Sequence, residues 1–259
     1  MSSYRLLNGL LTTVKTSLGV PSTTKCPKIA LSWSGGKDSA WALYLLRQQD
    51  EYEVAALVTT LNSHFNRVAI HGFREELLDA QAASVGLPLW KIPLPWPCSN
   101  EDYESRIGAL CERAVAEGFS GFAFGDLFLE DIRAYREKML APTGLTPVFP
   151  VWGIPTDELA RTMIEGGLRA RLTCVDLKHL DASFAGREFD GSFLRDLPAG
   201  VDPCGERGEF HTFVSDGPMF RQPVGCRHDH TVERDGYAYA ELLSTSFDRI
   251  GAGFALGSG

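Results

Sequence analysis

Several features are missing from this chain of 259 residues, and each absence excludes a class of protein. No apolar run reaches the roughly 18 residues that a membrane-spanning helix needs, so we expect no membrane span. None of the six cysteines forms a C-x-x-C pair, which argues against a compact zinc site and favours reduced thiols in a cytoplasmic protein. No Lys/Arg run is present, and 33 acidic against 25 basic residues give a net charge of −8, which disfavours nucleic-acid binding.

Acidic residues are also missing from the N-terminus, where none precedes Asp38. We therefore treat residues 1–27 as an N-terminal extension. Frequent serine and threonine without acidic residues are typical of organelle transit peptides, but Arg5 is the only arginine in the extension. We favour a short helix over 4–18, and a targeting peptide stays an alternative.

Short apolar segments alternate with helical patterns from residue 28 to about residue 150. Strands are expected over 28–33, 54–60, 89–92, 121–126 and 146–151. Helices are expected between them, over 40–49, 74–85, 100–117 and 128–140. This alternation predicts an α/β fold with a doubly wound, parallel five-stranded sheet, whose ligand lies beyond the carboxyl ends of the strands.

The pattern weakens after residue 150, and residues 151–259 predict a smaller C-terminal α+β lobe. Its clearest elements are a helix over 156–166 and strands over 171–176 and 209–214. Residues 184–208 are rich in glycine, proline and charge, and we assign no helix or strand there.

A polar loop joins the first expected strand to the first expected helix, and its sequence is Ser34-Gly35-Gly36-Lys37-Asp38-Ser39. Two glycines let the backbone approach a ligand closely, and the amides at the helix start favour an anion. Lys37 adds a positive charge, and the hydroxyls of Ser34 and Ser39 add donors, so the loop predicts a phosphate site. It is not a Walker A loop, because Leu31 occupies the position of the first glycine. Asp38 would repel phosphate unless it caps the helix or binds Mg²⁺.

Three residues at or after the end of the fourth expected strand are further candidates for this site. Gly125 and Asp126 lie where the strand ends, at the same sheet edge as the loop. We expect Asp126 at the nucleotide or, together with Asp38, at Mg²⁺; capping of the next helix is the alternative. Arg133 shares a helix face with two glutamates, which predicts either surface ion pairs or a phosphate ligand.

A second polar cluster lies far downstream, within residues 202–212. Its candidate catalytic residues are Cys204, Glu206, Glu209 and His211. A thiol, two carboxylates and an imidazole at this spacing can position a base, a metal ion or an amine. Glu209 and His211 would share one face of a strand, and Cys204 is a candidate nucleophile. An exposed polar turn is the alternative.

A third group consists of Cys226, His228 and His230, whose side chains are all of metal-binding type. No fourth ligand is evident in the sequence. We therefore expect a surface turn there, without a metal.

Ordered blocks of these residues resemble one enzyme family. Residues 34–39 resemble the pyrophosphate loop of the ATP pyrophosphatases, whose fold is adenine nucleotide α-hydrolase-like. Within that superfamily, residues 204–210 resemble the C-G-E-x-G-E-[FY] element of the diphthine–ammonia ligases, and residues 125–133 and 147–153 resemble two further blocks. The resemblance runs from about residue 28 to residue 243.

The resemblance implies an ATP-binding domain over 28–150 and a substrate lobe over 151–259. It also implies an amide-forming ligase that uses ATP and Mg²⁺, adenylates a carboxylate with loss of pyrophosphate, and then joins the carboxyl carbon to ammonia or another amine with release of AMP. In such an enzyme, residues 34–39 and the block 125–133 would hold ATP, and the cluster within 202–212 would orient the amine or the acceptor. The acceptor of the family is diphthine on translation elongation factor 2, a protein.

Two departures from the ligase pattern leave the acceptor open. His211 stands where archaeal and eukaryotic ligases tend to have another glutamate, and Asp126 interrupts their usual Gly-Ala-Ile block. The chain is thus more similar to a bacterial-type branch, and bacteria do not make diphthamide. Two other functions stay open, a tRNA-modifying sulfur or nitrogen transferase and a non-catalytic adenine-nucleotide sensor. The sequence also leaves open whether the chain forms a homodimer.

Overall fold

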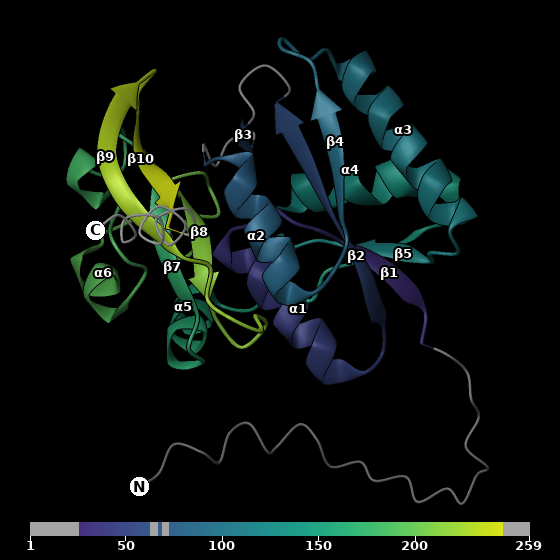
Figure 1. Cartoon of the computed structure of the whole chain (residues 1–259), viewed down its shortest axis with the longest axis horizontal. Helices are drawn as coiled ribbons and strands as arrows, with labels where there is room; N and C mark the ends of the chain where they lie inside the picture. Colours follow the sequence, from purple (N-terminus) through teal and green to yellow (C-terminus); the bar gives the residue numbers. More distant parts are fainter. Residues whose placement is uncertain (1–25, 63–66, 69–72, 246–259) are drawn as a thin grey trace, which may run out of the picture.

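Two β-sheets organise the computed structural model of this chain, which describes residues 26–62, 67–68 and 73–245 (Figure 1). The helix expected over 4–18 lies outside the described residues, as does almost all of the expected extension. No helix within the described ranges is long and apolar enough to cross a membrane.

The first sheet contains parallel strands in the order β4-β2-β1-β5-β6. They are β1 (Lys28–Ser32), β2 (Glu53–Asn62), β4 (Leu89–Leu94), β5 (Gly121–Ala123) and β6 (Thr146–Val148). A short strand, β3 (Arg67–Val68), pairs antiparallel with the end of β2. The chain builds the sheet outwards on one side of β1 and then on the other, so the predicted doubly wound parallel fold is confirmed. Strands β5 and β6 end earlier than the sequence predicts.

Helices cover both faces of this sheet (Figure 1). Helices α1 (Lys37–Gln49) and α2 (Glu75–Val85) lie on one face, in a core that continues into the C-terminal part of the chain. Helices α3 (Asn100–Ala116) and α4 (Glu130–Leu140) lie on the other face around a second core, and a 3₁₀ turn, η1 (Ala141–Thr143), follows α4. The first face is therefore the one against which the second sheet packs.

The second sheet is antiparallel and has the strand order β8-β7-β10-β9. Its strands are β7 (Arg169–Asp176), β8 (Phe210–Asp216), β9 (Cys226–Arg234) and β10 (Tyr237–Ser244). The helical elements of this part are α5 (Thr156–Glu165), η2 (Ala182–Phe184) and α6 (Gly191–Asp196). The predicted C-terminal α+β lobe is confirmed.

Two segments of this lobe differ from the prediction. Helix α6 forms within residues 184–208, because the side chain of Asp190 accepts two backbone N–H groups of its first turn (2.9 and 2.8 Å). Cys226, His228 and His230 lie on strand β9 and not in a turn. In the described part of the chain, no three potential ligands are grouped so as to hold a metal ion.

The amide of Gln81 joins the two lobes at the point where α2, β8 and the loop after β1 meet. Its Nε2 donates to the carbonyl oxygens of Gly35 (3.0 Å) and Val214 (2.6 Å), and its Oε1 accepts from Trp33 Nε1 (3.1 Å). The backbone N–H of Val214 also donates to the Gly35 carbonyl (3.0 Å). Gln81 is fully buried, so water cannot replace these bonds.

We expect Gln81→Ala to lower the free energy of unfolding by about 2–4 kcal/mol, because it leaves several buried polar groups without partners. Urea unfolding measures this change. Gln48→Ala removes the same side chain from an exposed position of α1 and is expected to change the free energy by less than about 0.5 kcal/mol. Equal losses in the two variants would show that Gln81 does not hold the lobes together.

Candidate nucleotide and acid–base site

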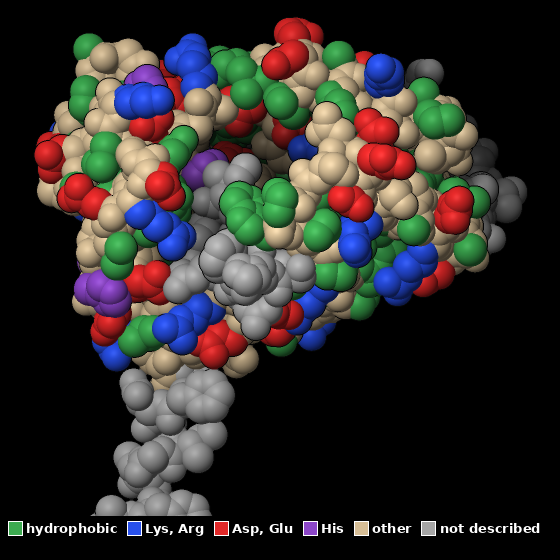
Figure 2. Space-filling view, turned by 90° about the horizontal axis from the view of Figure 1, so that it is seen from above, with side chains coloured by type: hydrophobic (Ala, Val, Ile, Leu, Met, Phe, Trp, Pro, Cys, Tyr) green, Lys and Arg blue, Asp and Glu red, His purple; other side chains and the backbone are tan. Residues whose placement is uncertain are grey.

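Two adjoining cavities lie at the carboxyl ends of β1 and β5, each with a volume of about 240 Å³. The side chains that line the first, the apolar cavity, include Val58, Ile107, Leu110, Phe122, Phe124 and Leu140. The side chains that line the second, the polar cavity, include Lys37, Asp38, Asp126, Glu206, His211 and Thr212. Figure 2 shows this edge of the molecule hollowed, with charged and histidine side chains inside the hollow.

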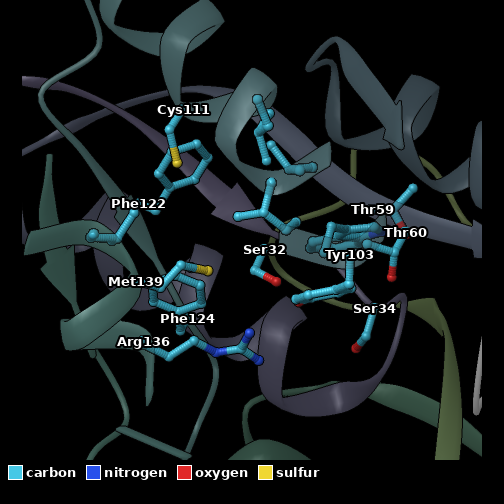
Figure 3. A pocket seen from close by; sticks show the side chains of 15 residues that line it. Ser32, Ser34, Thr59, Thr60, Tyr103, Cys111, Phe122, Phe124, Arg136 and Met139 are labelled. Atoms are coloured by element: carbon cyan, nitrogen blue, oxygen red, sulfur yellow. The ribbon is translucent and has the colours of Figure 1, made fainter. Parts of the chain in front are cut away.

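Three residues line both cavities, namely Ser32, Ser34 and Arg136. In Figure 3 the apolar side chains of Phe122 and Phe124 lie on one side of the apolar cavity, and Ser32 and Ser34 lie on the other. The site therefore changes from apolar to polar across a single boundary.

The predicted phosphate loop forms the start of α1, which opens on the polar cavity. Gly36 is the N-cap and has no capping side chain. Ser34 Oγ accepts from the backbone N–H of Gly36 and lies within hydrogen-bond distance of Ser39 Oγ (both 3.2 Å). This arrangement leaves the helix N-terminus facing a cavity, which is a favourable place for an anion.

Gly35 and Gly125 allow close packing around the loop. Gly35 has a left-handed φ of 77°, and a Cβ there would lie 2.6 Å from Cζ of Phe73. A Cβ on Gly125 would lie 2.9 Å from the backbone nitrogen of Ser39. Gly125 thus lets the chain after β5 approach α1, which brings Asp126 into the polar cavity.

Lys37 is buried, and its ammonium group points towards the C-terminal lobe. It donates to Asp38 Oδ2 (2.9 Å) and to the carbonyl oxygen of Cys204, and it lies 5.2 Å from the ring centre of Phe210. Burial lowers the pKa of Lys37, but Asp38 and other nearby acidic groups outweigh it, so the pKa is raised above its ordinary value. Lys37 is therefore a permanent positive charge beside the loop.

Asp38 carries a buried oxygen that the protein does not satisfy. Within the described residues, Oδ1 of Asp38 has no hydrogen-bond partner. Burial raises the pKa of Asp38 above its ordinary value, although the neighbouring Lys37 lowers it. A water molecule, a ligand donor or a cation can satisfy a buried oxygen of this kind.

Arg136 enters the site from α4, whereas the predicted ligand Arg133 does not. Arg136 Nε donates to Asp126 Oδ2 (3.4 Å). Arg133 lines neither cavity; its Nε donates to Glu137 (2.8 Å), and its guanidinium lies 4.8 Å from the ring centre of Trp152. Arg133 thus forms the surface ion pair that the sequence leaves as one of its two alternatives.

A sequence signal for Arg136 existed. Ile132, Met139 and Leu140 lie at helical spacing from it and are the partly or fully buried apolar residues of α4. Arg136 thus stands inside the stripe that faces the sheet, where a charged side chain is unusual.

The downstream cluster forms a hydrogen-bonded turn beside the loop. Asp202 Oδ1 accepts from the backbone N–H of Cys204 (2.9 Å) and of Glu206 (3.3 Å). The two carboxylate oxygens of Glu209 accept from the backbone N–H of Asp202 and of Arg207 (both 3.0 Å). Glu209 is buried and lines neither cavity. It therefore stabilises the turn and, contrary to the prediction from the sequence, does not lie beside His211 in the site.

Cys204 and His211 occupy different environments in this turn and strand. The Cys204 thiol is buried and donates to the carbonyl of Thr156 (3.4 Å). Burial raises the pKa of the Cys204 thiol far above its ordinary value, although Lys37 lowers it, so the thiol stays protonated and is a poor nucleophile. His211 is half-buried and lines the polar cavity.

Glu206 reaches from the C-terminal lobe to the segment that follows β5. Its Oε1 accepts from the backbone N–H of Leu127 (2.8 Å), just after Asp126. Burial raises the pKa of Glu206 from 4.5 to about 7; the bond from Leu127 lowers it, and the charge of Asp38 raises it further. Glu206 can therefore take up or release a proton near neutral pH.

Comparison with known proteins identifies the family. A family model described as the diphthamide synthase N-terminal domain matches residues 27–147, and one described as the diphthamide synthase C-terminal domain matches residues 155–238. The chain belongs to the diphthamide synthase family. The two family models thus cover both the part with the parallel sheet and the lobe that carries Glu206.

Relatives of this diphthamide synthase family member are similar over most of their length. A diphthine–ammonia ligase from Danio rerio is 27% identical over 248 residues, which cover 84% of this chain and 93% of that protein. One from Mus musculus is 24% identical over 254 residues, covering 86% and 91%. Among solved structures, the U34-tRNA thiolase NcsA from Methanococcus maripaludis is 20% identical and covers 56% of this chain and 59% of that one, with a TM-score of 0.34.

The raised pKa of Glu206 makes folding stability depend on pH in this family member. The folded state keeps a proton that the unfolded state releases above about pH 4.5, so rising pH favours unfolding until it passes the folded pKa of about 7. Between about pH 5 and pH 8, we expect the native chain to lose about 1–3 kcal/mol of unfolding free energy relative to Glu206→Gln. Urea unfolding across this range measures the difference.

Glu233→Gln, at an exposed position of β9, is the control and should keep the pH dependence of the native chain. If Glu206→Gln had the same pH dependence as the native chain, Glu206 would have an ordinary pKa.

Proposed function

We propose that this chain is an ATP-dependent amide-forming ligase of the diphthine–ammonia ligase type, which adenylates a carboxylate and releases AMP and pyrophosphate. The observation that carries the proposal is the meeting of an apolar and a polar cavity at the phosphate loop, with Glu206 facing the polar one. An adenine nucleotide has the same division, because its base is apolar on both faces and its phosphates are charged. The names of the curated relatives support the same reaction.

The phosphates would lie in the polar cavity, against the start of α1. The helix dipole and the hydroxyls of Ser34 and Ser39 favour an anion there, and the buried Lys37 adds a full positive charge. The adenosine would lie in the apolar cavity between α3, α4 and the sheet. This placement leaves the α-phosphate at the boundary, within reach of both lobes.

The polar cavity also suits Mg²⁺. This ion prefers one or two carboxylates together with phosphate oxygens and water. Asp38, with its unsatisfied Oδ1, and Asp126 are the carboxylates that would hold it. When bound, Mg²⁺ would neutralise part of the phosphate charge.

The reaction would proceed in two substitutions. In the first, a carboxylate oxygen of the acceptor bonds to the α-phosphorus, and the bond between that phosphorus and the oxygen bridging to the β-phosphate breaks, so that pyrophosphate leaves. In the second, the nitrogen of ammonia bonds to the acyl carbon, and AMP leaves. Glu206, with its pKa of about 7, takes the proton that the nitrogen loses. The turn that Asp202 and Glu209 brace keeps Glu206 at this place.

The products of ATP cleavage test the proposal. We expect AMP and pyrophosphate to form when the protein is incubated with Mg²⁺, ATP, ammonium and elongation factor 2 that carries diphthine, and we expect mass spectrometry to show the diphthine carboxylate converted to an amide. Release of ADP and phosphate would overturn the mechanism. Formation of AMP and pyrophosphate only with another carboxylate acceptor would keep the chemistry and replace the substrate.

Glu206→Gln tests the role of the acidic residue in the reaction. Its amide oxygen can still accept from Leu127 N, but it cannot take a proton, so we expect kcat to fall by about 100-fold while KM for ATP stays about the same. Steady-state AMP formation measures both constants. Glu233→Gln on the exposed strand β9 should retain the native rate. An unchanged kcat in Glu206→Gln would exclude Glu206 as the base.

A further inference from the structure

Arg136 lies at the boundary between the two cavities, whereas Lys37, the other Lys or Arg side chain that lines them, belongs to the polar cavity alone. It projects from α4 among residues that face the sheet. In Figure 3 its guanidinium points towards the side of the cavity on which Ser32 and Ser34 lie. The side chain thus extends from the apolar cavity towards the phosphate loop.

The guanidinium of Arg136 is held in place but is poorly satisfied. It lies over the ring of Phe124, 4.9 Å from the ring centre, and Nε donates to Asp126 Oδ2 at the long distance of 3.4 Å. Among the described residues, Asp126 is the only hydrogen-bond acceptor of this side chain. A guanidinium has five N–H donors, and a planar pair of them matches two oxygens of one phosphate. The donors that remain are available to a ligand in the cavity.

We infer that Arg136 binds the α-phosphate of the nucleotide, and that Asp126 holds the guanidinium in position before the nucleotide binds. The inference rests on the proposed ATP site. A nucleoside in the apolar cavity and a phosphate chain in the polar cavity place the α-phosphate at their boundary, where Arg136 lies. The other cationic residue that lines the cavities, Lys37, is turned towards the carbonyl of Cys204.

Binding of the α-phosphate would also release Asp126. A bidentate bond to phosphate is shorter and stronger than the 3.4 Å bond between Arg136 and Asp126, so the phosphate replaces the carboxylate as the partner. The freed carboxylate of Asp126 then becomes available in the polar cavity, where we place Mg²⁺. Arrival of the nucleotide and completion of the cation site are in this way coupled through one side chain.

Adenosine, AMP and ATP differ only in their phosphates, so their affinities test the inference. We would measure them by isothermal titration calorimetry without Mg²⁺. For Arg136→Gln, we expect the affinities for AMP and for ATP to fall by the same factor, about 10- to 100-fold, while the affinity for adenosine stays the same. Arg136→Lys should lose less, because an ammonium keeps the charge but not the bidentate geometry. Asp126→Asn should bind AMP more tightly, since it removes the competing charge.

Arg133→Gln is the matched control, because Arg133 lies on the same helix and pairs with Glu137 outside both cavities. It should leave all three affinities unchanged. Urea unfolding of each variant confirms that it is folded before titration.

Other results of these titrations would each contradict one part of the inference. A loss for ATP alone would move Arg136 to the β- or γ-phosphate, and an equal loss for adenosine would make it a packing residue of the apolar cavity. Weaker AMP binding by Asp126→Asn would remove its holding role. If the native chain bound none of the three ligands, the proposed function would fail. If the native chain bound ATP and Arg136→Gln bound it with the same affinity, the inference alone would be refuted.

Discussion

The hydrogen bonds of one buried amide, Gln81, determine how the rest of the site is arranged. They connect the strand that precedes the phosphate loop, the loop itself and β8 of the other lobe. β8 in turn follows directly on the turn that carries Glu206, so the position of that carboxylate depends on the same bonds. The backbone N–H of Lys37 donates to Thr212 on β8 (3.1 Å), which adds a second connection between loop and strand. The site therefore lies between the two lobes and needs residues from both.

Burial sets the electrostatics at this junction. Asp38 and Glu206 are both withdrawn from water, and burial is the first cause of the raised pKa of each. Their negative charges act on the ammonium of Lys37, whose pKa is raised although it too is buried. The site thus contains its own counter-charges: Lys37 pairs with Asp38, and Arg136 pairs with Asp126. An arriving phosphate chain competes with these internal partners.

The sequence predicts the fold well because each strand and helix of the first sheet carries its own apolar pattern. It also predicts that the loop at the start of α1 and the downstream cluster belong to one site, since both resemble family elements. It does not predict the partner of each side chain. The carbonyl that binds Lys37 lies 167 residues away, and local spacing carries no information about it. Residue spacing favoured Arg133 and Glu209 as site residues. In the structure Arg136 lines the cavity instead of Arg133, and the carboxylate of Glu209 binds backbone N–H groups of its own turn. The sequence does not predict helix α6, because the capping bonds of Asp190 and not the composition of the segment stabilise this helix.

The contact between the phosphate loop and β8 has a consequence for how the protein is made. On the ribosome, the chain from Lys28 to Val148 emerges first and can pair all its parallel strands, yet its nucleotide loop still lacks Thr212 and Val214. A nascent or prematurely ended chain would therefore have an unbraced loop and would lack Glu206. The loop therefore reaches its final geometry only after β8 has been synthesised and has docked against it.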